Sequence, residues 1–456
     1  MRETTMQETA EYEEIPAALI EEPLTPREAR LERAARGLQL GAAANGIAAA
    51  LLVIIGVIGA AFTAGGIFQT AHNLLLFRYT GPDDQALLIV LLLVLINASA
   101  LLVGMVGVLA QELWSFLVGV GLAIANVALL ITLGFTPALI SLVALGWTLS
   151  VLIPDLRAFR ANPVMLKELR ERMRGSRAFA VITVYLTLMS VFTVLLYISR
   201  SPLTQGVSTG VTGELGRVLF AGVVGIELML IIFIAPAFTA GAVTGERERK
   251  TYDLLQITLL PRPSFIIGKL ESALGYIFLL LLAAIPLQSI AFLFGGVSET
   301  ELIISFIILV VTAIALGTIG LYFSTAAERT LTASVRAYSF VFGLLFAAPA
   351  IIALILGFIG RFFYTGGSGF RGPAFLEGAL IYLNDFLSSL NPMVTALRTQ
   401  ELLITQQRLG FYQQTLSSTG TAVTLVSPWV TFTIIYLVLS AVMITLAIRK
   451  MRRTEL

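Results

Sequence analysis

The chain has 456 residues, of which 57% are apolar and 13% are charged, and its formal net charge is +2. Soluble domains average ~45–50% apolar and ~25% charged residues, so this composition is that of a polytopic membrane protein and gives no reason to expect nucleic-acid binding. The absence of cysteine and the single histidine, His72, exclude disulfides, thiolate metal sites and histidine-rich metal sites.

The N-terminal segment, residues 1–26, is predicted to be a disordered acidic cytosolic tail. It is rich in glutamate, and such a segment cannot bury enough apolar surface to fold. The first apolar run begins too far into the chain, and is too long, for a secretory signal.

Ten apolar runs are long enough to cross a hydrocarbon core of ~30 Å, which takes roughly 20 helical residues. They lie at about 40–66, 86–110, 113–133, 135–153, 178–199, 217–243, 265–294, 301–325, 338–360 and 428–448. The predicted fold class is therefore an all-α polytopic membrane protein with about ten transmembrane helices. The break from Gly134 to Pro137 decides this number, because nine helices would place the two termini on opposite sides.

The basic residues predict the orientation, because lysine and arginine accumulate in short cytoplasmic loops. With ten helices and the N-terminus inside, all four lysines fall on the cytoplasmic side. The same side holds the arginines of residues 27–36, 157–177 and 449–453. We therefore expect a multi-pass protein of the cell membrane (plasma or inner membrane) with both termini in the cytoplasm.

Residues 27–156 are predicted to form a four-helix transmembrane domain with very short turns. Its main polar residues at membrane depth are Asn45, Asn97 and Asn126. Asparagine at such depth usually hydrogen-bonds between helices. We therefore interpret the three residues as contacts within a bundle rather than as a site.

Residues 157–177 are predicted to contain a cytoplasmic amphipathic helix on the membrane surface. Asn162 is a favoured N-cap residue, and Pro163 suits the first helical position. Apolar side chains recur at three- and four-residue spacing at Met165, Leu166, Leu169 and Met173, and the other faces carry Lys167, Arg170, Arg172 and Arg174. This pattern favours a helix whose apolar stripe faces lipid and whose arginines face anionic head groups. A simple membrane anchor is a compatible interpretation.

The segment from Gly245 to Lys269 is polar and lies between two long apolar runs. Successive charges occupy residues 246–250, a short amphipathic pattern follows at 252–257, and Pro261 and Pro263 end it. A loop that only reversed the chain would not need this pattern. We interpret the segment as a cytoplasmic element on which another protein docks, with a plain solvated loop as the alternative.

Three motifs within this region carry a family resemblance. They are Pro-Ala-Phe-Thr-Ala-Gly-Ala-Val-Thr-Gly-Glu-Arg-Glu-Arg at 236–249, Thr-Tyr-Asp-Leu-Leu at 251–255 and Gly-Lys at 268–269. Together they resemble the signature of ATP-binding-cassette (ABC) type-2 permeases, over roughly the C-terminal two thirds of the chain. Leu259 departs from the pattern, because many members have proline there, and this bears on where the element ends.

The resemblance implies a six-helix permease core over residues 178–456, in which a coupling helix at about 244–264 contacts a separate ATPase subunit. The implied ATPase-coupling residues are Glu246, Arg247, Glu248, Arg249, Thr251, Tyr252, Asp253, Leu254, Leu255 and Gln256. A segment similar to the Asn-Pro-x-x-x-Lys-Glu-Leu-Arg of this chain lines the ATPase cleft in the family, which implies a role there for Asn162, Pro163, Lys167, Glu168, Arg170 and Arg174. The implied partners are an ABC ATPase subunit, a second identical or related permease, and membrane lipids.

A long outer loop is predicted at about 361–427. Residues 374–390 are apolar enough to dip toward the bilayer before Asn391 and Pro392 break the pattern, and family members have short re-entrant helices in this place. Residues 398–426 are rich in Gln, Thr and Ser. They are predicted to extend the loop without a motif of their own, either as part of an outer lid or as a solvated loop.

One carboxylate, Glu227, lies about ten residues, or roughly 15 Å, inside an apolar run. An acidic residue at a helix centre costs about 2.5–3.5 kcal/mol on insertion scales, so it usually faces a cavity or a partner. We take Glu227 as a candidate for the translocation path, with a structural pairing to another helix as the alternative.

The chain contains no Gly-x-x-x-x-Gly-Lys-Ser/Thr phosphate loop and no His-Glu-x-x-His or Gly-x-Ser-x-Gly motif. We therefore predict a non-enzymatic permease subunit of an ABC exporter, without catalytic, metal or cofactor residues of its own, whose ATP-Mg is bound by the partner ATPase. A secondary transporter is the first alternative, although matching discontinuous helices are not evident. A non-transporting membrane scaffold is the second, and it would tolerate charge reversal at Glu246 and Glu248.

Overall fold

The fold is described from a computed structural model, which covers residues 26–61, 65–158, 162–174, 176–200, 211–252, 261–363, 374–406 and 409–453. The predicted acidic tail lies outside these residues except for its last position. So do Asp253, Leu254, Leu255 and Gln256. Within the described part, ten helices are long and apolar enough to cross a membrane. The predicted all-helical, ten-span class is confirmed.

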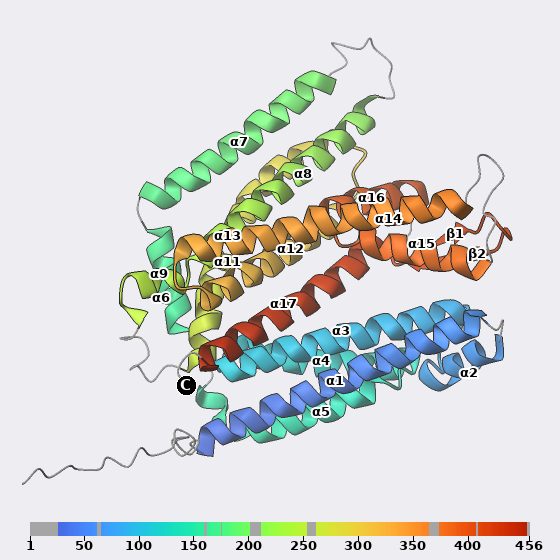
Figure 1. Ribbon diagram of the computed structural model, residues 1–456, viewed down its shortest axis with the longest axis horizontal. Coiled ribbons are helices and arrows are strands. Elements are labelled where there is room, and N and C mark those ends of the chain that lie inside the picture. The colour runs from blue at the N-terminus through green and yellow to red at the C-terminus, as the bar shows by residue number, and fades with distance from the viewer. Residues whose placement is uncertain are drawn as a thin grey trace, which may run out of the picture.

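The N-terminal part consists of α1 (Pro26–Ala61), α2 (Gly65–Leu75), α3 (Asp83–Ala110), α4 (Leu113–Leu133), α5 (Ala138–Leu152) and the 3-10 helix η2 (Ile153–Ala158). In Figure 1 α1 runs along α3 and α5, with which it makes most of its contacts. The predicted break between the third and fourth spans is confirmed. Gly134 ends α4 at φ +68°, a conformation that glycine adopts without a steric penalty.

The three predicted asparagines do hydrogen-bond within this bundle. The side chains of Asn97 and Asn126 exchange two bonds of 2.9 and 2.8 Å between α3 and α4. Asn45 donates to Ser141 Oγ of α5 at 3.1 Å. All three asparagines are buried, and each amide ties one helix to another at membrane depth. Oδ1 of Asn45 has no hydrogen-bond partner in the described structure.

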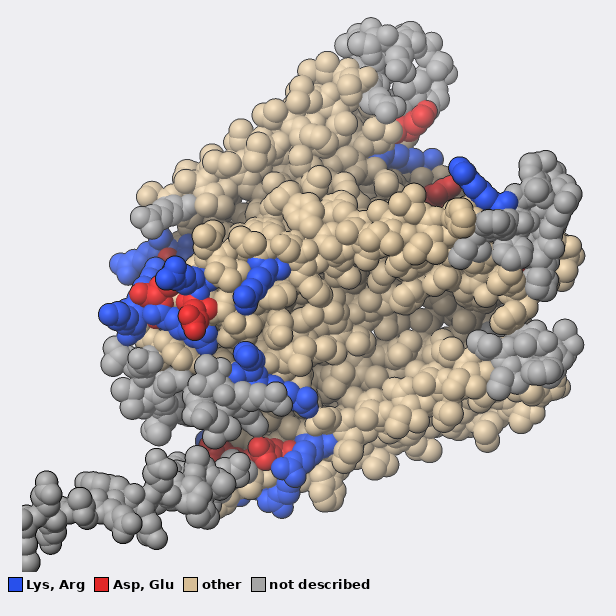
Figure 2. All heavy atoms as spheres, in the orientation of Figure 1, with Lys and Arg blue, Asp and Glu red and all other residues tan. Residues whose placement is uncertain are grey.

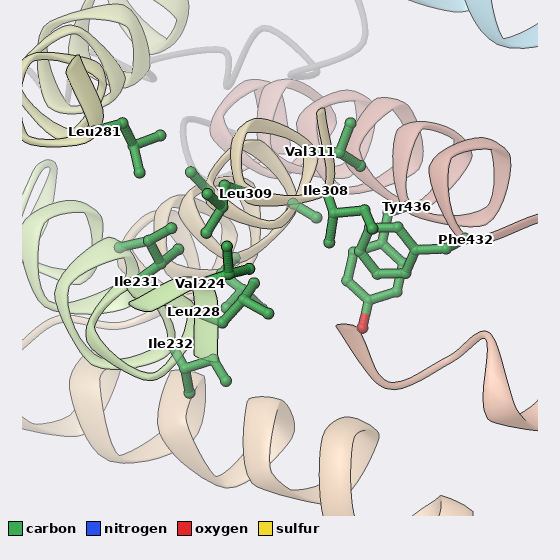
Figure 3. Packing of buried hydrophobic residues seen from close by; sticks show 14 of the residues in the cluster. Val224, Leu228, Ile231, Ile232, Leu281, Ile308, Leu309, Val311, Phe432 and Tyr436 are labelled. Atoms are coloured by element: carbon green, nitrogen blue, oxygen red, sulfur yellow. The ribbon is translucent and has the colours of Figure 1, made fainter. Parts of the chain in front are cut away.

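The C-terminal part follows, with α6 (Pro163–Met173), α7 (Ser176–Arg200), α8 (Val211–Ala240), α9 (Thr244–Glu248), α11 (Arg262–Leu293), α12 (Glu299–Ala326), α13 (Thr330–Phe342), the π-helical turn η4 (Gly343–Ala347), α14 (Ala348–Phe363), α15 (Ala374–Ser388), α16 (Pro392–Gln406), β1 (Phe411–Thr415), β2 (Ala422–Val426) and α17 (Pro428–Arg453). The helix at its centre is α12, whose span is the most buried of the ten. Figure 3 shows Leu228 of α8, Ile308 of α12 and Phe432 of α17 meeting in the main apolar cluster.

The two ends of the molecule differ in chemistry. Both described chain ends lie at one end of the helices, which we call the termini end, and the β-hairpin lies at the other, the hairpin end (Figure 1). Leu31 of α1 and Met451 of α17 belong to the same buried cluster at this end. In Figure 2 lysine and arginine gather at the termini end. The cytoplasmic location of this end stays a prediction.

The prediction of a motif-free loop at residues 398–426 is wrong. Helix α16 continues to Gln406, and β1 and β2 then pair antiparallel, with Phe411 opposite Val426. The buried carboxylate of Glu377 on α15 holds the hairpin turn, because it accepts bonds from the backbone N–H groups of Ser417 at 2.7 Å and Ser418 at 3.0 Å. Contacts with residues far away in the sequence therefore order this polar segment, whose own sequence shows little hydrophobic periodicity.

Helices α8 and α12 approach each other closely at Gly320. A Cβ atom at this position would meet the Thr239 hydroxyl and would lie 3.1 Å from the backbone of Pro236. We expect Gly320→Ala to lower the free energy of unfolding by about 1–3 kcal/mol, because backbone atoms cannot move aside as a flexible side chain does. The measurement is thermal unfolding of the purified protein in detergent.

The matched control is Gly357→Ala in α14, where nothing lies within 4 Å of the added Cβ. This variant should be neutral or gain up to ~1 kcal/mol from alanine's higher helix propensity. Equal unfolding temperatures for the two variants would show that the α8–α12 approach does not limit stability.

Candidate functional site

The candidate site lies at the termini end, where α9 follows α8 after a short turn. The start of α9 is held by Ser324 of α12, whose Oγ accepts from the N–H groups of Val243 at 2.9 Å and Thr244 at 3.2 Å. The helix ends at Glu248, and Lys250 adopts a left-handed φ of +57°, which stops helix propagation. Helix α9 covers only the first part of the predicted coupling helix of about 244–264, and residues 253–260 of that range lie outside the described part of the chain.

A buried lysine joins three helices at this site. The Lys269 ammonium on α11 contacts the carboxylate of Glu168 on α6 and lies 2.6 Å from Glu246 Oε1 on α9. The Lys269 side chain is only 6% exposed. Glu168 also accepts from Ser272 Oγ at 2.9 Å, and Glu246 accepts from the Thr251 hydroxyl. Separating these buried opposite charges would leave a charge without its partner away from water, which is strongly unfavourable, so the three side chains keep a defined geometry.

The other side of α9 is bonded to α12 and α13. Glu248 accepts from the N–H of Thr330 at 2.7 Å and from its hydroxyl at 2.9 Å, at the start of α13. Arg247 donates to the carbonyl of Ala327 at 2.7 Å and lies over the ring of Tyr252, 5.1 Å from its centroid. A carboxylate at a helix N-terminus is favourable because it satisfies unpaired N–H groups and opposes the helix dipole.

The predicted N-cap at Asn162 is confirmed, and it does more than start α6. Its Oδ1 accepts from the N–H of Val164 at 2.9 Å. Its Nδ2 donates to the carbonyl of Ser264 on α11 and to Oε1 of Glu112, both at 2.6 Å. Gly268 of α11 leaves the room for this side chain, because a Cβ there would lie 2.6 Å from Asn162 Oδ1. Asn162 is fully buried.

Glu112 brings the N-terminal part into this site. It lies in the turn between α3 and α4 and is 2% exposed. Two residues later, the indole N–H of Trp114 donates to Glu271 of α11 at 2.7 Å. Burial, together with the neighbouring Glu271 carboxylate, raises the pKa of Glu112 to about 7. Desolvation penalises the charged form of a carboxyl group, and a like charge adds to that penalty.

The outward surface of the site is basic. Lys167, Arg170 and Arg174 of α6 are exposed, and so are Arg249 and Lys250 after α9. In contrast, the predicted coupling residues Glu246, Arg247 and Thr251 are partly buried and hydrogen-bond within the chain. Glu248 is exposed, but its carboxylate is hydrogen-bonded to Thr330. The structure therefore divides the predicted set into side chains that face solvent and side chains that hold α9 in place.

Glu227, the predicted candidate in the membrane, lies apart from this end. It is fully buried on α8, accepts from Gln288 of α11 at 2.6 Å, and accepts from the Tyr185 hydroxyl of α7 at 3.3 Å. These contacts match the structural alternative, a pairing with other helices. A role in the translocation path stays a prediction.

Sequence analysis does not select Lys269, Glu112 or Glu271 as site residues. Lys269 belongs to the Gly-Lys motif, but its two carboxylate partners lie on other helices, and sequence spacing does not reveal them. The signal for Glu112 is an acidic residue in a very short turn between two apolar helices. No group of three or more side chains that could hold a metal ion occurs in the described part of the chain.

Two comparisons with known proteins bear on this arrangement. A family model described as ABC-2 family transporter protein matches residues 163–456, from the first residue of α6 onward and over about two thirds of the chain. No curated protein matches the chain. The four N-terminal spans lie outside the family match.

The raised pKa of Glu112 predicts a pH dependence of stability. In the folded protein the Glu112 carboxyl binds its proton more tightly than in the unfolded chain, where an ordinary glutamate has a pKa of 4.5. The free energy of unfolding therefore falls as pH rises from about 4.5 to about 7. Glu112→Gln keeps an oxygen acceptor for Asn162 and removes the charge. We expect it to stabilise the protein by on the order of 2 kcal/mol at pH 8 and much less at pH 5.

Thermal unfolding of both proteins at the two pH values measures this effect. Glu171→Gln, which removes an exposed carboxylate of α6, is the control and should follow the wild-type pH profile. A Glu112→Gln gain of the same size at pH 5 and pH 8 would contradict the assignment.

Removal of the Lys269 charge tests the central contact. Lys269→Met leaves two partly buried carboxylates facing each other, and we expect a loss of about 3–5 kcal/mol of stability in thermal unfolding. Adding Glu246→Gln to this variant removes one of the two charges and should recover part of the loss. Lys167→Met, at an exposed position on α6, should change stability by less than ~0.5 kcal/mol. Equal effects of the two lysine variants would refute the bridging role.

Proposed function

Because the chain belongs to the ABC-2 transporter family, with a permease domain over residues 163–456, we propose that it is the membrane subunit of an exporter driven by a separate ATPase. The family implies association with an ABC ATPase subunit. ATP-Mg would be bound and hydrolysed on that subunit, because this chain has no phosphate-loop motif. That transport runs outward is inferred from the resemblance to exporter permeases. The same resemblance implies a second permease subunit in the complex.

The observation that carries the proposal is the position of α9 at the junction of the permease helices. Through Glu246 it is joined to Lys269 of α11, and through Lys269 to Glu168 of α6. Through Glu248 it is joined to the start of α13. A force applied to α9 would therefore act on several membrane helices at once, as a coupling element requires.

The exposed residues indicate how an ATPase would approach. The side chains that face outward on α6 and after α9 are mostly basic, including Lys167, Arg170 and Arg249, and they lie at the termini end (Figure 2). Complementary charges across an interface speed encounter and fix orientation. We propose that the ATPase presents an acidic rim to these residues, while the internal contacts of Glu246 and Glu248 transmit its movement.

Co-purification of the ATPase subunit in mild detergent tests this docking surface. We expect the double variant Arg170→Glu and Arg249→Glu to retain less than about a tenth of the ATPase bound by the wild type, because each reversal places like charges together at the interface. Both residues are exposed, so the variant should keep the wild-type unfolding temperature. This separates lost docking from lost folding.

The matched control is Arg33→Glu, an exposed arginine of α1 at the same end of the molecule but in the N-terminal part. It should leave ATPase binding unchanged. Wild-type binding by the double variant would move the docking surface elsewhere. Failure of the intact chain to bring down any ATPase would favour the secondary-transporter or scaffold interpretation.

A further inference from the structure

A cavity of about 90 Å³ lies toward the hairpin end of the permease domain, between α8, α12 and α16. Its walls are mainly apolar and include Val224 and Leu228 of α8, Ile304 and Ile308 of α12, and Leu403 of α16. Val224, Leu228 and Ile308 are among the side chains of the main apolar cluster in Figure 3. The cavity thus lies beside the main apolar cluster, and an unfilled space in a protein interior is unusual.

Two buried polar side chains line the cavity, and each has an atom without a hydrogen-bond partner in the described structure. These atoms are Oε2 of Glu301, which is 6% exposed, and Oγ1 of Thr399, which is 2% exposed. Buried polar groups are normally satisfied, and each exception calls for an explanation. Two such exceptions on the wall of one cavity indicate a site built for a ligand.

The role of Glu301 in its own helix leaves this oxygen available. Glu301 forms a capping box at the start of α12, in which Oε1 accepts from the N–H of Ser298 at 3.3 Å and from its hydroxyl at 3.0 Å. One carboxylate oxygen therefore meets the local structural need, and Oε2 contributes nothing to the cap.

Thr399 also departs from its usual behaviour. Several buried threonines in the membrane-spanning helices donate their hydroxyl to a carbonyl of their own helix, as Thr312 does to Ile308 at 2.6 Å and Thr193 does to Met189 at 2.8 Å. On α16 the buried hydroxyls of Thr395 and Thr399 both lack a partner, and of these two only Thr399 lines the cavity. Thr399 makes no such bond, although its helix offers the same acceptors. Its hydroxyl remains available to a molecule in the cavity.

The charge of the lining narrows the chemistry of that molecule. Glu301 is the one charged residue among the side chains that line the cavity, and Ser305 and Gln400 are neutral. A partly desolvated carboxylate oxygen is satisfied best by a cationic donor. The apolar walls require the rest of the ligand to be apolar. A volume of about 90 Å³ admits the ammonium group with a single ring or the first part of an alkyl chain, and the remainder of a longer chain extends out through the open side of the cavity.

We propose that this cavity binds a cationic amphiphile, namely an alkyl or aryl ammonium compound. Its ammonium group donates to Oε2 of Glu301 and to Oγ1 of Thr399, and its apolar body lies against Val224, Leu228 and Ile308. The inference concerns binding by the permease chain itself. It stands whether or not an ATPase docks at the opposite end.

Photoaffinity labelling of the purified full-length chain, without nucleotide or ATPase, tests the site. The probe is an octylammonium with a diazirine on its alkyl chain, and the comparison probe carries a hydroxyl in place of the ammonium. We expect the ammonium probe to label peptides within residues 220–228, 301–308 or 393–403, and unlabelled octylammonium to compete. The hydroxyl probe should label these peptides at least about fivefold less at equal concentration.

The variants separate recognition from folding. Glu301→Gln keeps the capping box, which accepts glutamine at this position, and it should weaken competition by octylammonium about tenfold or more. Thr399→Val, which removes only the hydroxyl, should weaken it about threefold. Glu299→Gln removes an exposed charge from the same first turn of α12 and should have no effect.

Three results would overturn the proposal. They are labelling spread over lipid-facing helices without competition, equal labelling by the two probes, and wild-type competition in Glu301→Gln. Unfolding temperatures of the variants, measured in parallel, show whether a lost signal reflects a lost site or a lost fold.

Discussion

The contact on which the termini end depends is the buried ammonium of Lys269 between two carboxylates. An isolated charge at 6% exposure would be costly, so Glu168 and Glu246 must both stay close, and α6 and α9 are held at fixed positions on α11. The hydroxyls of Ser272 and Thr251 take up remaining acceptor capacity of these carboxylates. A cluster of this kind contributes less to net stability than to specifying one arrangement of the three helices, and a coupling element needs such an arrangement.

The N-terminal part packs on α11 and α17 through α3, and its α3–α4 turn reaches the contacts around Asn162 at the start of α6. Glu112 accepts a hydrogen bond from Asn162, the N-cap residue of α6, and Trp114 donates one to Glu271 of α11. The four extra spans therefore contact α6 and α11, the two helices that Lys269 also joins. Burial and the neighbouring Glu271 carboxylate of α11 together raise the pKa of Glu112. The family match begins at residue 163, one residue after the asparagine that makes the contact.

The sequence predicts those features that depend on neighbouring residues. The ten spans follow from continuous apolar length, the break at Gly134 from its position between two of them, and the cap at Asn162 from the proline that follows it. The bonds of Lys269 to Glu246, which is 23 residues away, and of Thr330 to Glu248, 82 residues away, require the fold itself. The β-hairpin could not be predicted because its turn is held by Glu377, a residue 40 positions earlier.

Helix α8 links the two ends of the permease domain. Its middle part carries Val224 and Leu228, which line the cavity, and its last residue lies four positions before α9. Between them stands Pro236 inside the helix, which removes one backbone hydrogen bond and lowers the cost of bending there. Gly320 of α12 packs against the same point and limits how far a bend can go. The contacts of Glu246 and Glu248 tie α9 to its neighbouring helices. A displacement of α9 would therefore also strain α8, and a bend of α8 at Pro236, limited by Gly320, would shift the residues of α8 that line the cavity.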